Sequence, residues 1–306
     1  MRLLQPVFRQ LFPLKSQELS MFPEHFTISI SSIITDGVDV FVATYGSTFR
    51  AFSDVVLFFL LQIEQILRGA PWWLVVLVVG FLGFILARRI LFSVGLMSAT
   101  LLLGVLGLWD QAMQTLSLMI SALVFAAALG IPFGVILARF KRLRLVFLPI
   151  LDAMQTLPSF VYLVPALMLF GLGKVPALIA TIIYAVPPVA RLTDLGLRHA
   201  DAEAVEAANA FGATPQQRLW WVELPLALPS IMAGLNQATM MALSMVVVAS
   251  MIGARGLGEE VLLGIQRLDT GRGIVAGTAI VVLAIVLDRL TQASMRRLQR
   301  TPQSSV

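Results

Sequence analysis

Residues 191–225 read RLTDLGLRHADAEAVEAANAFGATPQQRLWWVELP. This is the one long polar stretch between apolar segments, which end at Ala190 and resume at Leu226. Its start and stop signals predict two short helices joined by a turn. Asp201 can cap the first helix with its side chain, and Gly212 can end that helix in a left-handed conformation.

The second short helix is predicted to begin at Thr214. Thr214, Pro215 and Gln217 supply a cap, a first-turn proline and a capping-box partner. The apolar residues that follow run up to Pro225. We therefore expect a helix, a turn and a helix that project from the apolar part of the protein.

The first of these helices carries a surface suited to docking. Ala207 and Ala208 give a flat face that another protein can approach closely, and Glu206 offers an anion to a basic partner. These three residues alone leave an alternative open, which is an amphipathic helix lying on the membrane surface.

The composition places the chain in a lipid bilayer. Of its 306 residues, 58% are hydrophobic and only 13% are charged, and the mean hydropathy is +0.89. So little polar surface cannot cover a soluble core of this size. The net charge of +5 does not indicate nucleic-acid binding, because the basic residues lie in short clusters beside apolar runs.

The apolar segments predict an all-α polytopic membrane protein with about seven transmembrane helices. The segments are 72–87, 90–108, 114–138, 145–170, 175–190, 226–252 and 274–287. Residues 72–110 would form two accessory spans. Residues 1–71 would form an extracytoplasmic tail whose segment 49–67 has helical apolar spacing. That segment predicts an interfacial amphipathic helix or, as the alternative, a helix packed on the membrane domain.

The positions of the basic residues predict the orientation. If the tail lies outside, thirteen of the 22 Lys and Arg residues become cytoplasmic, as the positive-inside rule favours. The N-terminus is then outside, and residues 296–306 form a cytoplasmic tail. The polar stretch 191–225 lies on the cytoplasmic side in this arrangement.

Three short motifs in the polar stretch resemble the EAA loop of ABC importer permeases. They are Glu206-Ala207-Ala208, Gly212 and Val222-Glu223-Leu224-Pro225, where the usual Ile is replaced by Val222. Over residues 102–292 the resemblance narrows to permeases for glycine betaine, proline betaine and choline. The segments 154–165, 184–193 and 243–252 carry it.

The resemblance implies a type I ABC importer permease core at residues 111–295, with 191–225 as its coupling loop. A separate cytoplasmic ATPase would receive that loop, and an extracytoplasmic binding protein would deliver the substrate. The coupling residues would be Glu206, Ala207, Ala208, Gly212, Val222, Leu224 and Pro225. The chain itself has no Walker A motif, so we expect no enzyme activity, bound cofactor or metal, with ATP and Mg²⁺ used by the ATPase. Two ATPase subunits would need two permease copies.

The implied substrate is glycine betaine, proline betaine, choline or carnitine. A quaternary ammonium group is best held by aromatic faces, because it cannot donate strong hydrogen bonds. The candidate pathway residues are Phe160, Tyr162, Asn236, Gln237, Met240 and Ser244. Ordinary interhelical packing is the alternative explanation for each of them.

The stretch 253–273 is expected on the outside, where Glu259 and Glu260 would contact the binding protein. A plain solvated connection is the alternative. Two other functions remain open at this point: a permease for another small solute, and an ion-coupled secondary transporter. The latter would leave the EAA-like loop unexplained.

Overall fold

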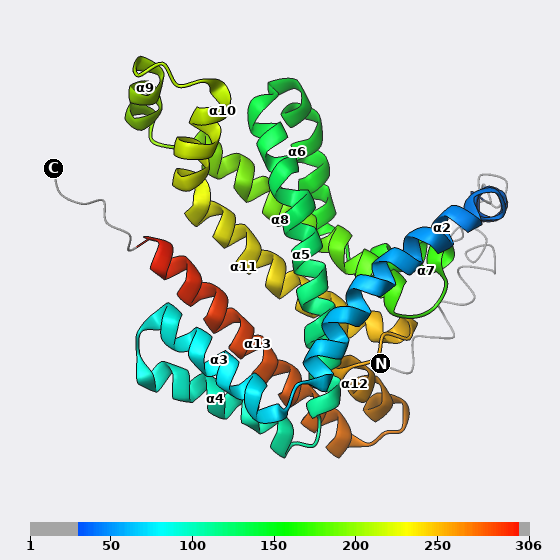
Figure 1. Ribbon diagram of the computed structural model, residues 1–306. Helices are drawn as coiled ribbons and strands as arrows, with labels where there is room; N and C mark the ends of the chain where they lie inside the picture. Colours follow the sequence, from blue (N-terminus) through cyan, green and yellow to red (C-terminus); the bar gives the residue numbers. More distant parts are fainter. Residues whose placement is uncertain (1–29, 300–306) are drawn as a thin grey trace, which may run out of the picture. The chain divides into compact units, whose positions relative to one another are not determined.

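The computed structural model describes residues 30–299, and every regular element in that range is a helix. The predicted all-α fold is therefore confirmed (Figure 1). The helices are α2 (Ile30–Gly69), α3 (Trp72–Ala87), α4 (Ile90–Val105), α5 (Trp109–Arg139), α6 (Lys141–Thr156), α7 (Phe160–Phe170), α8 (Lys174–Arg198), α9 (Ala202–Ala210), α10 (Pro215–Arg218), α11 (Leu224–Ala249), α12 (Leu257–Gln266) and α13 (Thr270–Gln299). The parts of the predicted N-terminal and C-terminal tails at residues 1–29 and 300–306 lie outside the described residues.

Helix α8 is the centre of the core. It packs along both α5 and α11, and α6 and α7 also contact it. The main apolar cluster includes Leu118 of α5, Leu178 of α8 and Met245 of α11, all nearly inaccessible to solvent. Close packing of these apolar surfaces fixes the relative positions of the helices. The hydrophobic effect alone cannot do so, because lipid is as apolar as the helix surfaces.

Helices α5 and α8 approach closely at two glycines of α5. A Cβ built on Gly134 would lie 2.5 Å from the Ala190 carbonyl oxygen, and one on Gly130 would lie 2.8 Å from the Val189 Cβ. Both distances are far below van der Waals contact, so only glycine fits without separating the helices. The pair therefore sets the spacing of α5 and α8.

We expect Gly134→Ala to destabilise the protein by about 1–3 kcal/mol, because the added methyl group meets backbone atoms that cannot move aside. The measurement is the midpoint of thermal unfolding in detergent. Gly277→Ala is the matched control, since a Cβ at Gly277 meets nothing within 4 Å. Equal midpoints for the two variants would refute this packing role.

Among residues 30–299, four to six helical segments are long and apolar enough to span a membrane, against the about seven spans predicted. Four helices, α5, α8, α11 with its preceding turns, and α13, are long and apolar enough to cross a membrane. Two bent pairs, α2 with α3 and α6 with α7, pass the same test together. Helix α4 has only 16 residues, about 24 Å of helix against about 30 Å of hydrocarbon.

The segment 145–170 was predicted as one span, but it is broken. Helices α6 and α7 meet at an angle of 99°. Leu157, at the break, has φ −68° and ψ 138°, which is the extended conformation favoured before a proline such as Pro158. Pro149 and Pro165 lie inside their helices.

The C-terminal half of α2 packs on the membrane domain, which favours the second alternative for the segment 49–67. Val56 and Leu60 belong to the main apolar cluster, with 4% and 0% of their surfaces exposed. Glu64 is also buried, and its carboxylate accepts two hydrogen bonds from Lys174 Nζ at 2.6 and 2.7 Å. Residues 30–47 of α2 belong to a different compact unit from the one that begins at Thr48.

Candidate functional site

The predicted loop between α8 and α11 contains a short capped helix, α9. Asp201 caps it, since its side chain accepts a hydrogen bond of 2.9 Å from the Glu203 amide. No residue of α9 is buried. Helix α8 continues past Ala190 to Arg198, so the loop proper is shorter than residues 191–225. Figure 1 shows α9 and α10 at the end of α8 and α11.

The turn after α9 depends on Gly212, whose φ is +77°. The Gly212 amide donates to the Asn209 carbonyl at 3.0 Å, and the Ala213 amide donates to the Ala208 carbonyl at 3.0 Å. These bonds satisfy carbonyls that a helix end leaves unpaired. A residue with a Cβ is strained at this φ, so the sequence prediction for Gly212 is confirmed in its geometry.

The second short helix begins as predicted but does not end before α11. Thr214 and Gln217 form a complete capping box, with hydrogen bonds of 3.3 and 2.9 Å. Helix α10 then passes into a π-helical turn, Leu219–Glu223, and directly into α11. Val222 lies in that turn, and Leu224 and Pro225 open α11. The loop is therefore continuous with α11, with no break between α10 and the span.

Ion pairs of Glu223 with Arg218 and Arg139, called the Glu223 clamp below, hold the loop to the end of α5. They were not predicted from the sequence. Glu223 accepts from Arg218 at 2.7 Å and from Arg139, at the end of α5, at 3.2 Å. Arg218 also donates to the Asn209 side chain at 3.0 Å, and Arg139 donates to the Pro215 carbonyl at 3.2 Å. In the sequence, the only indication of this clamp is that Glu223 lies inside the Val222–Pro225 motif.

The outer surface of the loop is apolar as well as exposed. Glu206 and Ala207 are exposed, and large apolar side chains are uncovered beside them, with exposed fractions of 92% for Phe211 and 80% for Trp221. Exposed aromatic surface of this kind marks a contact with another protein or with the membrane.

The six candidate pathway residues do not form one site in the single chain. Gln237, Met240 and Ser244 are exposed on one face of α11, and Ser244 Oγ donates to the Met240 carbonyl at 3.1 Å. Asn236 faces α13 instead and accepts a hydrogen bond from Thr291.

The two aromatic candidates lie on α7 and differ in exposure. Phe160 is 49% exposed. Tyr162 is partly buried, donates to the Met154 carbonyl, and has its ring centroid 5.5 Å from that of Tyr184. Tyr162 is thus occupied by contacts within the chain, as the packing alternative expects.

The comparisons with known proteins agree with the loop geometry. The family described as binding-protein-dependent transport system inner membrane component matches residues 130–300, which include the whole loop. The chain belongs to this family. It is therefore an inner-membrane permease subunit of an ABC importer, and hydrolysis of ATP belongs to a separate subunit.

Two curated relatives match most of this permease. The glycine betaine/proline betaine permease protein ProW of Escherichia coli K12 is 47% identical over 276 residues, covering 89% of this chain and 77% of ProW. The glycine betaine/carnitine permease protein GbuB of Listeria monocytogenes is 43% identical over 273 residues, covering 87% and 95%. The resemblance inferred from the motifs is confirmed.

A solved structure confirms the importer fold. An inward-facing form of the MetNI methionine ABC transporter contains a chain with 25% sequence identity and a TM-score of 0.54. The match covers 63% of the permease described here and 94% of that chain. The type I importer permease fold that the resemblance implies is therefore confirmed.

The two candidate binding-protein contacts of the permease lie at the start of α12 and differ from each other. Glu260 is held inside the chain: it accepts from Arg272 at 2.7 Å and from Gln111 at 3.4 Å. The Glu259 side chain makes no hydrogen bond or ion pair with residues 30–299. Of the two, Glu259 is the one whose carboxylate forms no such bond within the described residues, and it is partly exposed. Within the same range, no group of three His, Asp or Glu side chains could hold a metal ion.

Proposed function

We propose that this permease forms the translocation pathway for a small quaternary ammonium compound: glycine betaine, proline betaine, choline or carnitine. The observation that supports the proposal most strongly is the 47% identity to ProW across 89% of the chain. GbuB, whose name adds carnitine, matches over a similar length.

The uncovered pathway candidates have the chemistry this substrate class requires. A methylated ammonium is a weakly hydrated, permanent cation that binds aromatic faces and polarisable atoms. Phe160 and Met240 offer such groups on exposed surfaces of α7 and α11. Gln237 and Ser244 add uncharged polar groups that can contact a carboxylate or hydroxyl end.

The test is uptake into proteoliposomes that hold the permease, its ATPase and its binding protein. We expect ATP-dependent accumulation of at least one of labelled glycine betaine, proline betaine, choline and carnitine. A permease for another small solute is the competing function. Uptake of a different solute, with no uptake of any of these four compounds, would favour that competing function.

We further propose that residues 206–212 seat in a cleft of the ATPase, which alone uses ATP and Mg²⁺. The exposed face of α9, the left-handed Gly212 and the direct passage of α10 into α11 support this role. The Glu223 clamp would make loop and spans move together. An ion-coupled secondary transporter has no use for such a loop and does not fit the family.

The exposed face of α11 supports a second permease copy as the partner that covers it. Gln237, Met240 and Ser244 share this face, and polar residues on a membrane helix usually face a bundle or a water-filled cavity.

The chain has no cysteine. We therefore expect Ser244→Cys to give cross-linked dimers with a short bis-maleimide. Ile265→Cys, exposed on α12, is the control. Dimers from the control alone would contradict this interface.

Glu259 is proposed to contact the extracytoplasmic binding protein. Glu259→Lys should lower binding-protein-stimulated ATPase activity several-fold, because charge reversal at the edge of an interface weakens association. Glu260→Lys is unsuitable, since it would break the bond to Arg272. Unchanged stimulation over a range of binding-protein concentrations would support the plain solvated loop.

We propose the orientation with the N-terminus outside and the C-terminus cytoplasmic, from the distribution of Lys and Arg. Fusing a reporter to either end tests it. Different compartments for the two ends are expected, which requires an odd number of spans such as five within the range of four to six. The same compartment for both ends would contradict this orientation.

A further inference from the structure

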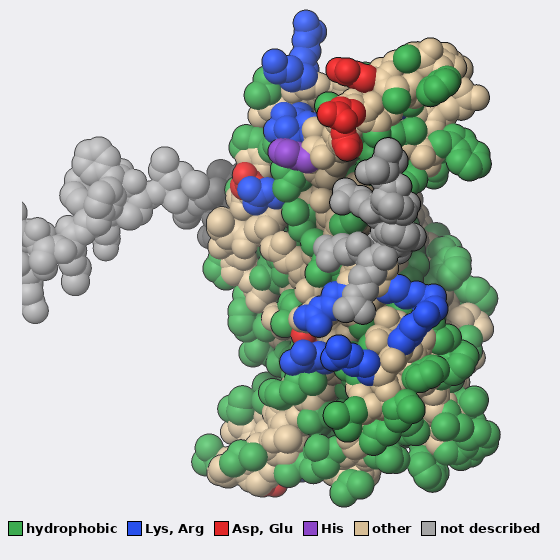
Figure 2. All heavy atoms as spheres, turned by 90° about the vertical axis from the view of Figure 1, so that its left-hand side faces the viewer, with side chains coloured by type: hydrophobic (Ala, Val, Ile, Leu, Met, Phe, Trp, Pro, Cys, Tyr) green, Lys and Arg blue, Asp and Glu red, His purple; other side chains and the backbone are tan. Residues whose placement is uncertain are grey.

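A basic cavity lies where the α3–α4 connection meets the end of α13. Its volume is about 600 Å³. The lining residues are Leu86, Ala87, Arg88, Arg89, Phe92, Arg289, Gln292, Ala293, Arg296 and Arg297. Figure 2 shows Lys and Arg side chains gathered on this face of the molecule, with hydrophobic side chains below them.

The five arginines of this cavity form no ion pair with the described acidic residues. Among the described residues that line the cavity, none is Asp or Glu. Within residues 30–299, Arg88, Arg89, Arg289 and Arg296 make no ion pair or side-chain hydrogen bond, and Arg297 donates only to the Ile85 carbonyl, at 3.2 Å. Elsewhere in the described chain, arginines such as Arg68, Arg139 and Arg218 are paired with carboxylates.

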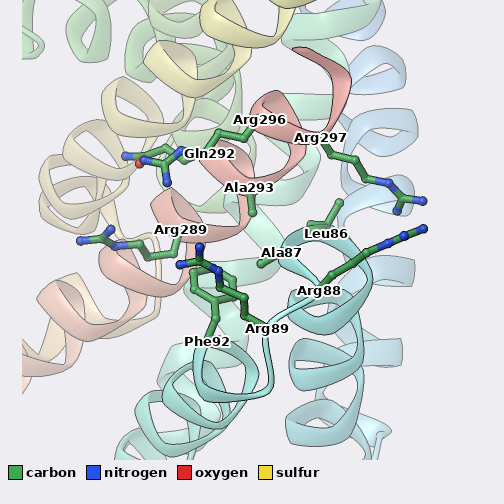
Figure 3. A pocket seen from close by; sticks show the side chains of 10 residues that line it. All are labelled: Leu86, Ala87, Arg88, Arg89, Phe92, Arg289, Gln292, Ala293, Arg296 and Arg297. Carbon is green, nitrogen blue, oxygen red and sulfur yellow. The ribbon is translucent and has the colours of Figure 1, made fainter. Parts of the chain in front are cut away.

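The cavity is built by two separate parts of the chain. In Figure 3, Arg88 from the α3–α4 connection and Arg297 from α13 both extend toward the right of the view. Arg89 and Arg289 lie toward the left. Arg88 has φ +50°, a conformation that is uncommon for any residue except glycine. Like charges held close together repel, and a bound anion would relieve that repulsion.

An apolar cavity begins one helical turn away. Its volume is about 340 Å³, and α2, α3, α4, α5 and α13 line it. On α3 it ends at Leu82, four residues before Leu86 of the basic cavity, and on α13 it ends at Leu290, three residues before Ala293. Residues three or four apart lie on the same helix face. Among the described residues that line it, only Thr100 is polar, and the Thr100 hydroxyl donates its hydrogen bond to the Leu96 carbonyl.

We propose that the two cavities together bind one anionic phospholipid, with its phosphate group among the arginines and an acyl chain in the apolar cavity. Guanidinium groups bind phosphate with paired, charge-assisted hydrogen bonds. Basic pockets between membrane helices are suited to anionic headgroups. A free phosphate explains the basic cavity but not the apolar one beside it, and an acidic protein segment has no acyl chain to fill it.

The bound lipid would join the α3–α4 hairpin to α13. Both helices of the hairpin pack on α13, but no ion pair within the described residues connects them at this end. The lipid phosphate would supply that connection between Arg89 and Arg289. The hairpin would then be held more firmly in membranes rich in anionic lipid.

The first test is native mass spectrometry of the full chain in mild detergent, titrated with phosphatidylglycerol or with phosphatidylcholine of the same acyl chains. We expect one phosphatidylglycerol to bind at least about tenfold more tightly, since each basic side chain near a headgroup contributes to binding. Arg89→Gln with Arg289→Gln should abolish the preference. Lys141→Gln with Arg142→Gln removes the same charge from the exposed start of α6 and should preserve it.

A second variant tests the apolar cavity separately. Val79→Phe fills part of that cavity and leaves every arginine in place. It should weaken phosphatidylglycerol binding about tenfold while changing nothing in the weak binding of inorganic phosphate. Unfolding midpoints of all variants check that the fold persists.

Three results would overturn the proposal. Equal binding of the two lipids would show that the arginines do not select a headgroup. Inorganic phosphate binding as tightly as the lipid, with no effect of Val79→Phe, would assign the site to a free anion. A preference for phosphatidylglycerol that survives loss of Arg89 and Arg289 would place the lipid elsewhere.

Discussion

Gly212→Val is expected to abolish ATP-dependent transport and to uncouple the ATPase, while the permease still inserts into the membrane. The φ of Gly212 is +77°, which a β-branched residue adopts only at a cost of about 1–3 kcal/mol. A Cβ there would meet no atom within 4 Å. The loss would therefore come from a changed turn and a displaced α9, and not from a clash in the core.

Uptake, binding-protein-stimulated ATPase activity and the amount of permease in the membrane fraction together check this expectation. Gly95→Val is the matched control: Gly95 lies in α4, is not among the glycines with positive φ, and a Cβ there would meet nothing within 4 Å. Gly212→Asn should retain part of the activity, because asparagine tolerates the left-handed region. Wild-type uptake by Gly212→Val would show that the turn has no role in coupling.

Lys174→Met is expected to destabilise the protein by about 3–5 kcal/mol. Glu64 is 4% exposed, and Lys174 Nζ lies 2.6 and 2.7 Å from its two carboxylate oxygens. Removing one member of a buried pair leaves the other charge poorly compensated. Among the described residues, the Glu64 carboxylate would keep Arg68, at 3.4 Å, but that guanidinium lies closer to Asp110, at 2.6 Å. The thermal unfolding midpoint in detergent should fall accordingly.

The double variant Glu64→Leu with Lys174→Met removes both charges. It therefore separates the cost of an unpaired Glu64 charge from the cost of losing the ion pair. It should recover most of the lost stability, because apolar side chains of similar volume can replace a buried ion pair at little cost. If the double variant were as unstable as Lys174→Met, the pair would matter for its packing and not for its charge.

Local sequence signals predicted the backbone conformation of the loop between α8 and α11 well. Asp201, Gly212 and the capping box at Thr214 take the predicted conformations, because caps and left-handed turns depend on a few neighbouring residues. The passage of α10 into α11 was not predictable in this way. A π-helical turn has no sequence signal comparable to a cap.

Longer-range features were beyond the sequence. Three prolines interrupt residues 145–170, yet only Pro158 follows a break, and nothing local distinguishes it from Pro149. Glu64 belongs to the polar side of an amphipathic pattern, and its burial follows from Lys174, 110 positions away. The four-residue spacing of Gly130 and Gly134 is common in membrane helices. It becomes important here because α8 packs directly against both glycines.

Transport by this permease is expected to be driven by ATP hydrolysed in a separate subunit that contacts the loop around Gly212. The most direct measurement is uptake of labelled glycine betaine by proteoliposomes containing the permease, its ATPase and its binding protein. We expect accumulation only with ATP and all three proteins, and none with Gly212→Val. Equal accumulation driven by an imposed Na⁺ or H⁺ gradient without ATP would contradict the account.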